Sequence, residues 1–262
     1  MKRILQKETE DSLVPMIRLI LTLLFIILFL LLSIPILIIE WLIGKKNRYA
    51  ADISQLRIVQ RAFRGILFLC GTHITVIGEE HVPNDTAVLY VGNHRSFFDI
   101  VITYARCPGL TGYVAKDSML KVPLLSLWMK RLYCLFLNRD NVKEGLKTIL
   151  TGINQIKSGI SMCIFPEGTR QRGGDETDLL PFKEGSLKMA EKTGCPIIPM
   201  ALTGTADILE NHFPWIRSAH VTLQYGEPIY PGKLDRETKK RLGSYTQTKI
   251  LEMLNESKQL QS

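Results

Sequence analysis

Hydrophobic and polar positions divide the chain into two parts with different patterns. Residues 19–39 carry no charge and consist almost entirely of Leu, Ile and Phe. A helix rises ~1.5 Å per residue, so this run is long enough to match the ~30 Å hydrocarbon core of a bilayer. The run exceeds the apolar core of a usual signal peptide, and no small-residue cleavage site follows it. The pattern therefore predicts a membrane-embedded helical segment and disfavours a cleaved leader.

Pro35 interrupts the apolar run, because proline lacks a backbone N–H and clashes with the preceding helical turn. We expect the helix to kink or end near Ile34, so a re-entrant helical hairpin competes with a straight span. Lysines and arginines lie on both sides of the run, and the positive-inside rule therefore gives no orientation. A hairpin would place both flanks on the cytoplasmic side.

A second helix with a basic face is predicted just after this run. Its apolar positions repeat at helical spacing: Leu56, Val59, Phe63, Ile66, Leu67 and Cys70. Arg57, Arg61 and Arg64 fall on another side of the same helix. The apolar face suits packing on a domain core and also suits the membrane interface, and the two interpretations are compatible.

Beyond residue 72 the pattern changes to short apolar runs separated by helical stretches. Seven candidate strands lie in residues 73–79, 86–93, 110–116, 132–139, 161–168, 196–204 and 219–229. Helices are predicted for residues 142–157, 185–193 and 235–259. We therefore expect an α/β fold with a mixed, roughly seven-stranded sheet flanked by helices. Residues 1–70 form the predicted anchor, and residues 71–262 form the predicted catalytic domain.

The segment NHRSFFD (93–99) directly follows a candidate strand, where α/β sheets place ligands. Ser96 and Asp99 have the S-x-x-D spacing that starts a helix, which leaves His94 in the preceding loop. The bend can bring His94 over Asp99, and a carboxylate on one ring nitrogen leaves the other nitrogen free as a base. The plainer interpretation makes Asp99 only a capping residue, and spacing alone favours it.

The segment FPEGTR (165–170) also follows a candidate strand. Pro166 and Gly168 mark a sharp turn, and Gly168 lets the backbone approach a ligand. Arg170 offers a planar fork suited to phosphate, so the segment predicts an anion site. The alternative is an ordinary turn with a surface Glu–Arg pair. Lys116 and Arg139, at the ends of two other candidate strands, can add charge to the same cleft.

Composition narrows the functional classes. The 262 residues carry a net charge of +8, which fits an anionic partner but does not choose one. Five scattered cysteines without a C-x-x-C pair argue against a disulfide framework, and the five histidines lack metal-ligand spacing, so no metal is expected. Nucleotide-binding loops and the G-x-S-x-G elbow are absent, and no nucleic-acid recognition motif accompanies the basic charge.

With four ordered segments, the chain resembles the glycerolipid acyltransferases, most closely those that make phosphatidic acid from 1-acylglycerol 3-phosphate. NHRSFFD is similar to the family's N-H-x-x-x-x-D block and FPEGTR to its F-P-E-G-T-R block. LLPFKEG (179–185) and CPIIPMAL (195–202) are similar to its third and fourth blocks. Ser126 and Tyr133 stand where members often have glycine, and Asn138 where they often have aspartate.

The resemblance implies an activity and assigns roles to residues. His94 would deprotonate the hydroxyl of a lysophospholipid while Asp99 holds the imidazole, and backbone N–H groups near the His94 loop or the new helix start would receive the oxyanion. Arg170 would grip the acceptor phosphate. The remaining predicted substrate-binding residues are Glu167, Gly168, Thr169, Lys116 and Arg139.

The resemblance also implies partners. The acyl donor would be acyl-CoA or acyl-carrier protein, which act as co-substrates, so no cofactor is expected. Membrane lipids and the lysophospholipid acceptor are the other expected partners, with the catalytic domain on the cytoplasmic face of the cell membrane. Two alternatives stay open: another acceptor, such as glycerol 3-phosphate or a lyso-ornithine lipid, and a non-catalytic membrane lipid-binding protein.

Overall fold

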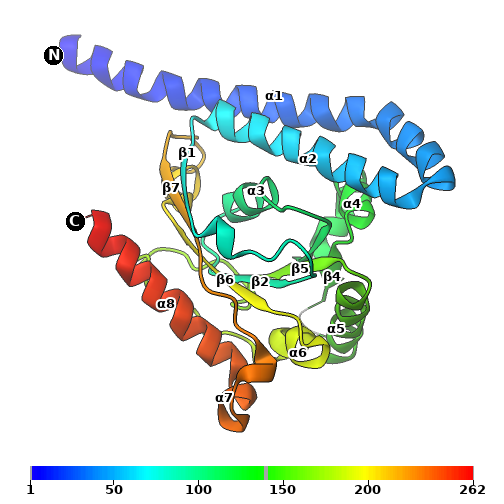
Figure 1. The fold of residues 1–262 in the computed structure, drawn as a ribbon. Coiled ribbons are helices and arrows are strands. Elements are labelled where there is room, and N and C mark those ends of the chain that lie inside the picture. Colours follow the sequence, from blue (N-terminus) through cyan, green and yellow to red (C-terminus); the bar gives the residue numbers. More distant parts are fainter. Residues whose placement is uncertain (1, 139–140, 262) are drawn as a thin grey trace.

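The sheet has seven strands in the order β1-β7-β6-β2-β5-β3-β4, and each lies inside a predicted run. The computed structural model describes residues 2–138 and 141–261 (Figure 1). The strands are β1 (His73–Ile77), β2 (Leu89–Gly92), β3 (Thr111–Lys116), β4 (Leu135–Leu137), β5 (Ser161–Ile164), β6 (Ile197–Thr203) and β7 (His220–Tyr225). β6 and β7 pair antiparallel and the other neighbours pair parallel, so the sheet is mixed as predicted.

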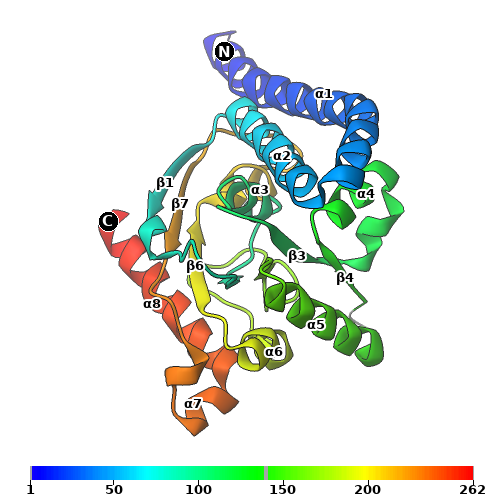
Figure 2. The same cartoon turned by 45° about the vertical axis from the view of Figure 1, so that its right-hand side comes forward.

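Helices cover both faces of this sheet (Figures 1 and 2). The helices are α1 (Lys2–Lys46), α2 (Arg48–Cys70), α3 (Phe98–Tyr104), α4 (Pro123–Arg131), α5 (Val142–Lys157), α6 (Glu184–Thr193), α7 (Arg236–Lys240) and α8 (Leu242–Gln261). On β2, Tyr90 joins the core under α2 and α3, whereas Leu89 and Val91 join the core against α5, α6 and α8. Because neighbouring strand residues point to opposite faces, this all-apolar strand is buried on both sides.

The first two helices form an antiparallel hairpin across one side of the domain (Figure 2). The turn is short because Asn47 caps α2, with its Oδ1 accepting from the Ala50 N–H at 3.0 Å. α1 continues through Pro35 and bends toward its carboxyl end, so the expected ending near Ile34 is wrong (Figure 1). The hairpin therefore turns at Asn47, after the apolar run and not within it.

Helix α1 is long and apolar enough to cross a membrane from Leu13 to Lys46. Only 17% of its most apolar window is buried, which is unlike the core helix of a soluble protein. Its inner face packs on the rest of the chain: Phe25 contacts α2 near Gly65, and Phe29 stacks on Trp128 of α4. The outer face leaves a continuous apolar surface exposed.

The packing interpretation of the second helix is confirmed. Leu56, Val59, Ile66, Leu67 and Cys70 are buried, and α2 lies between α1 and α3. Its polar side chains also connect the two parts, since they donate to backbone carbonyls at the end of α3 and just beyond it. The donors on this face are Arg57, Gln60 and Arg64. The division at residue 70 stays a prediction; Gly71, with φ of 68°, provides the left-handed turn that ends α2.

Two local predictions differ from the structure, and one residue has an unusual conformation. The helix expected to begin at Ser96 begins at Phe98, because the Ser96 Oγ accepts from the Phe98 N–H and caps the helix from outside. The predicted helix over residues 235–259 is two helices, α7 and α8, separated at Arg241. Tyr133 has φ of 61°, a conformation that glycine adopts readily, and its hydroxyl donates to Asp52 on α2.

Candidate active site

The site lies at the carboxyl end of the central strand β2. Asn93 directly follows β2 and is buried, and its amide exchanges two hydrogen bonds with the backbone of Leu202 on β6. The Nδ2–O distance is 2.9 Å and the N–Oδ1 distance is 2.8 Å. Asn93 thus extends the pairing of β2 with β6 by one side chain, which fixes the point at which the chain leaves the sheet.

His94 and Asp99 meet as predicted from their spacing. The His94 Nδ1 lies 2.8 Å from the Asp99 Oδ2, and the Asp99 side chain has no exposed surface. The same oxygen accepts from the backbone N–H groups of Arg95 at 2.7 Å and Ser96 at 2.8 Å. Asp99 is therefore a capping residue and a histidine partner at once, and the two interpretations of the segment are not exclusive. Within the described residues the His94 Nε2 has no partner, so this nitrogen is available as a base.

The predicted source of oxyanion donors is wrong for residues 94–99. The His94 N–H donates to Glu167, and the N–H groups of residues 95 and 96 donate to Asp99. The Phe97 N–H donates to Glu210, and the N–H groups of residues 98 and 99 donate to Ser96. Each of these N–H groups already has an acceptor: three carboxylates, the Ser96 hydroxyl or the Ser96 carbonyl.

The FPEGTR turn supports His94 from the neighbouring strand β5. The Phe165 ring stacks on the imidazole, with ring centroids 4.4 Å apart and an interplanar angle of 20°. Glu167 is buried, and its two oxygens accept from the N–H groups of His94 at 2.7 Å and Leu180 at 2.9 Å. Burial raises the pKa of the Glu167 carboxyl, and these two N–H donors oppose the rise. Glu167 therefore joins loops rather than facing open solvent.

The residue types at positions 168 and 170 fit their places in the turn. Gly168 has φ of 74°, and a Cβ there would lie 2.8 Å from the Lys183 Nζ. Thr169 is exposed at the surface of the turn. The Arg170 Nη1 donates to the Glu210 Oε1 at 2.7 Å, and its guanidinium lies 3.6 Å from the centre of the Phe97 ring. The planar fork of Arg170 is thus held in one orientation.

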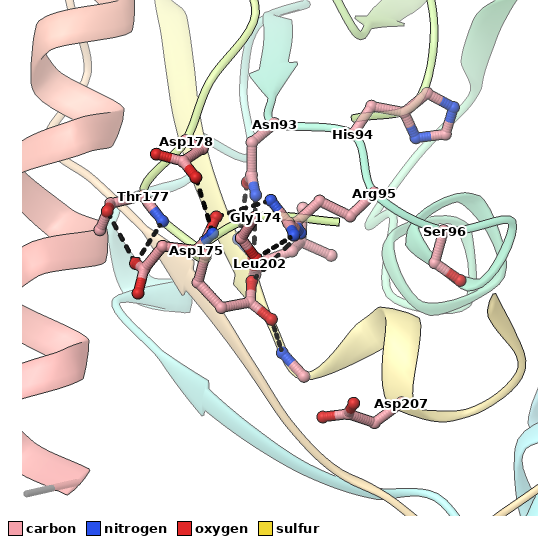
Figure 3. Close-up of polar contacts among 12 residues, drawn as sticks. Asn93, His94, Arg95, Ser96, Gly174, Asp175, Thr177, Asp178, Leu202 and Asp207 are labelled. Atoms are coloured by element: carbon pink, nitrogen blue, oxygen red, sulfur yellow. Dashed lines mark hydrogen bonds and ion pairs between the residues drawn. The ribbon is translucent and has the colours of Figure 1, made fainter. Parts of the chain in front are cut away.

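Arg95 is a buried arginine of the NHRSFFD segment for which no role was predicted. Its guanidinium donates to the carbonyls of residues 173, 174 and 175 at 2.8, 3.2 and 2.8 Å. Figure 3 shows Arg95 pointing away from the His94 ring and into this loop. Glu176 lies beside it, with an Arg95 Nε–Oε2 distance of 3.8 Å, and also accepts from the Gly204 N–H. Arg95 therefore holds the loop that follows Arg170 and is not a free cation for substrate.

The other two predicted cations are placed differently. Lys116 ends β3, two strands from β2, at the same edge of the sheet and with an exposed side chain. In the part of the chain that the structure describes, no contact joins it to His94 or Arg170. Arg139 lies outside the described residues. The structure therefore brings His94, Asp99 and the FPEGTR turn together and leaves Lys116 at their periphery.

Two cavities of about 410 Å³ each are lined in part by residues of the NHRSFFD and FPEGTR segments. The first, called the polar cavity because charged side chains line it, contains Arg95, Arg170, Arg172 and Glu210 beside the Phe97 ring. The second is mostly apolar and lies between α5 and α6. It is bounded by Phe165, whose ring stacks on His94. A cavity with charged side chains and an apolar cavity thus both border the FPEGTR turn.

Sequence reasoning missed Glu210, Arg95 and the Phe165 ring. Glu210 belongs to no recognisable segment and lies 113 residues from Phe97, to whose N–H it is bonded. Arg95 and Phe165 lie inside the segments that were singled out. These two residues could have been found, because buried arginines and aromatic rings usually have specific partners and both lie in segments already identified as functional candidates.

Comparisons with known proteins place the chain among acyltransferases. The family described as Acyltransferase matches residues 73–203, which include both segments. A 1-acyl-sn-glycerol-3-phosphate acyltransferase of Borreliella burgdorferi is 33% identical over 191 residues, covering 72% of this chain and 74% of the relative. A protein of the same description from Cocos nucifera is 32% identical over 197 residues, covering 70% of this chain and 58% of the relative.

A solved structure has the same fold. The crystal structure of the 1-acyl-sn-glycerophosphate acyltransferase PlsC from Thermotoga maritima aligns with a TM-score of 0.75. The alignment covers 91% of this chain and 96% of that chain at 23% sequence identity. The likeness extends over the N-terminal helices as well as the sheet.

Proposed function

The chain belongs to the acyltransferase family, and on that premise we propose that it acylates the free hydroxyl of 1-acyl-sn-glycerol 3-phosphate to form phosphatidic acid. It is an O-acyltransferase, and its relatives carry the name of this reaction. The observation that carries the proposal is the His94–Asp99 pair, because Asp99 fixes the Nδ1 of the ring and leaves Nε2 free. The proposed donor is an acyl thioester, either acyl-CoA or acyl-carrier protein.

The proposed reaction is a direct transfer. The His94 Nε2 takes the proton from the acceptor hydroxyl as that oxygen attacks the thioester carbonyl carbon. The tetrahedral intermediate then collapses, the C–S bond breaks, and the thiolate leaves with the proton that His94 returns. Asp99 stabilises the imidazolium that forms between the two steps. No acyl-enzyme is required, and no cofactor enters this sequence.

Arg170 is the proposed ligand of the acceptor phosphate. Its guanidinium lines the polar cavity, and a planar fork matches phosphate oxygens well. Glu167, Gly168 and Thr169 would shape the turn that presents it. Lys116 and Arg139 would add positive charge for the acceptor or for the anionic donor.

Membrane attachment is proposed for the N-terminal hairpin. The outer face of α1 is apolar along its length, and a lysophospholipid is dissolved in the bilayer. A site held against the membrane can receive such an acceptor without moving it fully into water. We place the α/β domain on the cytoplasmic face, where acyl-CoA and acyl-carrier protein are present.

The test is an acceptor panel on the detergent-purified protein. Free-thiol release from palmitoyl-CoA would be followed with lysophosphatidic acid, glycerol 3-phosphate, a lyso-ornithine lipid or no acceptor, and the lipid product identified by mass spectrometry. We expect release only with lysophosphatidic acid, with phosphatidic acid as product. A preference for another acceptor would overturn the proposed substrate, and silence with both palmitoyl-CoA and palmitoyl-acyl-carrier protein would favour a lipid-binding protein.

A further inference from the structure

Glu210 connects the two halves of the candidate site, although it lies outside every segment that the sequence singles out. It follows β6 in a short 3-10 helix, Glu210–His212. Its Oε1 accepts from the Phe97 N–H at 2.9 Å and from the Arg170 Nη1 at 2.7 Å. Its Oε2 accepts from the Ser96 Oγ at 2.6 Å. One carboxylate thus bonds the start of α3 and the end of the FPEGTR turn.

These contacts fix Arg170 before any ligand arrives. The guanidinium is stacked on Phe97 and bonded to Glu210 through one nitrogen, and its side chain is only 18% exposed. The remaining N–H groups have no partner among the described residues, and Arg170 lines the polar cavity. An arginine held in one rotamer loses less conformational entropy when it binds an anion than a mobile one does.

The other arginines of this cavity do not share this arrangement. Arg95 uses its guanidinium on three backbone carbonyls, and Arg172 is exposed. Among the described arginines of the cavity, Arg170 is therefore the one that is held in place and still has N–H groups to donate, and Glu210 is the group that holds it.

We propose that Glu210 is a positioning residue that orients Arg170 toward the acceptor phosphate. The inference rests on the proposed function of the site, and it assigns Glu210 no contact with the reacting atoms. The role depends on hydrogen-bond acceptance and not on charge. Glutamine has the same shape: its Oε1 can accept from Phe97 and Arg170, and its amide can donate to the Ser96 Oγ.

The variants Glu210→Ala and Glu210→Gln separate orientation from charge. We expect Glu210→Ala to raise the KM for lysophosphatidic acid about tenfold, with kcat within about threefold of the wild type. We expect Glu210→Gln to stay within about threefold of the wild type in KM, because it keeps the acceptor. Asp207→Ala is the matched control, since Asp207 is an acid of the same segment that accepts from Asn211.

A double-mutant cycle with Arg170→Ala distinguishes action through Arg170 from a general loosening of α3. If Glu210 acts through Arg170, adding Glu210→Ala to Arg170→Ala will not raise KM further. Additive effects in the cycle would overturn the proposal, as would a glutamine variant as impaired as the alanine variant.

Binding measured without turnover separates this inference from the proposed reaction. In the His94→Ala background, equilibrium binding of lysophosphatidic acid in detergent should weaken about tenfold with Glu210→Ala and be restored with Glu210→Gln. Unchanged binding would contradict the role of Glu210 even in an active enzyme. If Glu210→Ala weakens binding but the wild type acylates no acceptor, the role of Glu210 in binding would stand and the proposed reaction would be wrong.

Discussion

The N-terminal hairpin and the α/β domain distribute apolar and polar side chains in opposite ways. The outer face of α1 exposes large apolar residues, whereas its inner face buries Thr22, Ser33 and Glu40. The domain buries its apolar side chains on both sides of the sheet, and its polar ones around His94 are held by backbone groups. The difference indicates that the outer face of α1 suits apolar surroundings, whereas the site presents charged and hydrogen-bonding groups.

This comparison predicts that catalysis and membrane binding can be abolished independently by different substitutions. Substitutions around His94 should stop turnover in detergent and in membranes alike. Substitutions on the outer face of α1 should change membrane binding and leave turnover in detergent intact. The predictions below follow from the largest expected effect to the smallest.

Asp99→Asn is expected to lower kcat about 10²–10⁴-fold. The amide oxygen can still accept from the N–H groups of Arg95 and Ser96, so α3 keeps its cap, but the negative charge that stabilises the His94 imidazolium is lost. The measurement is steady-state thiol release in detergent, with Glu227→Gln, an exposed carboxylate at the far side of the sheet, as the control. A kcat within about threefold of the wild type would contradict the role of Asp99.

Removing two leucines from the outer face of α1 should weaken membrane binding about ten- to hundredfold. Leu24 and Leu28 are 58% and 50% exposed, and the paired alanine substitutions would be tested by flotation with phospholipid vesicles. Leu146 and Leu150 on α5 are exposed to a similar extent, 59% and 52%, and provide the matched control pair. An equal loss for both pairs would remove the distinction between the two regions.

Arg95→Lys should loosen the loop after Arg170. Lysine keeps the charge but cannot reach three carbonyls with a planar fork, so backbone amides near residues 171–178 should exchange hydrogen about tenfold faster. Hydrogen-exchange mass spectrometry in detergent measures this, and α8 serves as the internal reference. Unchanged exchange in the loop would mean that its order does not depend on Arg95.

The smallest effect concerns pH. Burial raises the pKa of Glu176 above its ordinary value, so the folded state binds this proton more tightly than the unfolded state does. Its contribution to stability is therefore present at low pH and lost as the pH rises through the raised pKa. Glu176→Gln keeps an acceptor for the Gly204 N–H and should flatten the decline in Tm above about pH 4.5. An equally steep decline in the variant would show that another group causes it.

Much of the fold follows from local pattern. The strands were predictable because each apolar run ends at a turn, and α5 has the predicted bounds, Val142–Lys157. The continuous path of α1 through Pro35 was not predictable, because packing on α2 and α4 sustains a helix that proline weakens locally.

The contacts of the candidate site also divide into those that local sequence predicts and those that it does not. His94 and Asp99 are five residues apart, so a capped helix start was enough to predict their contact. The bond from Arg170 to Glu210 joins positions 40 residues apart, and it depends on where the chain turns after β6. Spacing cannot report such a contact, and neither can it report that capping groups already occupy the N–H donors of residues 94–99.

The most direct test of the account is acceptor-dependent thiol release by the wild type and by His94→Ala in the same detergent. The account predicts release of one thiol for each phosphatidic acid formed by the wild type, and a loss of about 10²–10⁴-fold in kcat for the variant, with lysophosphatidic acid still bound. A His94→Ala variant that turns over at the rate of an active wild type would contradict the assignment of His94 as the base.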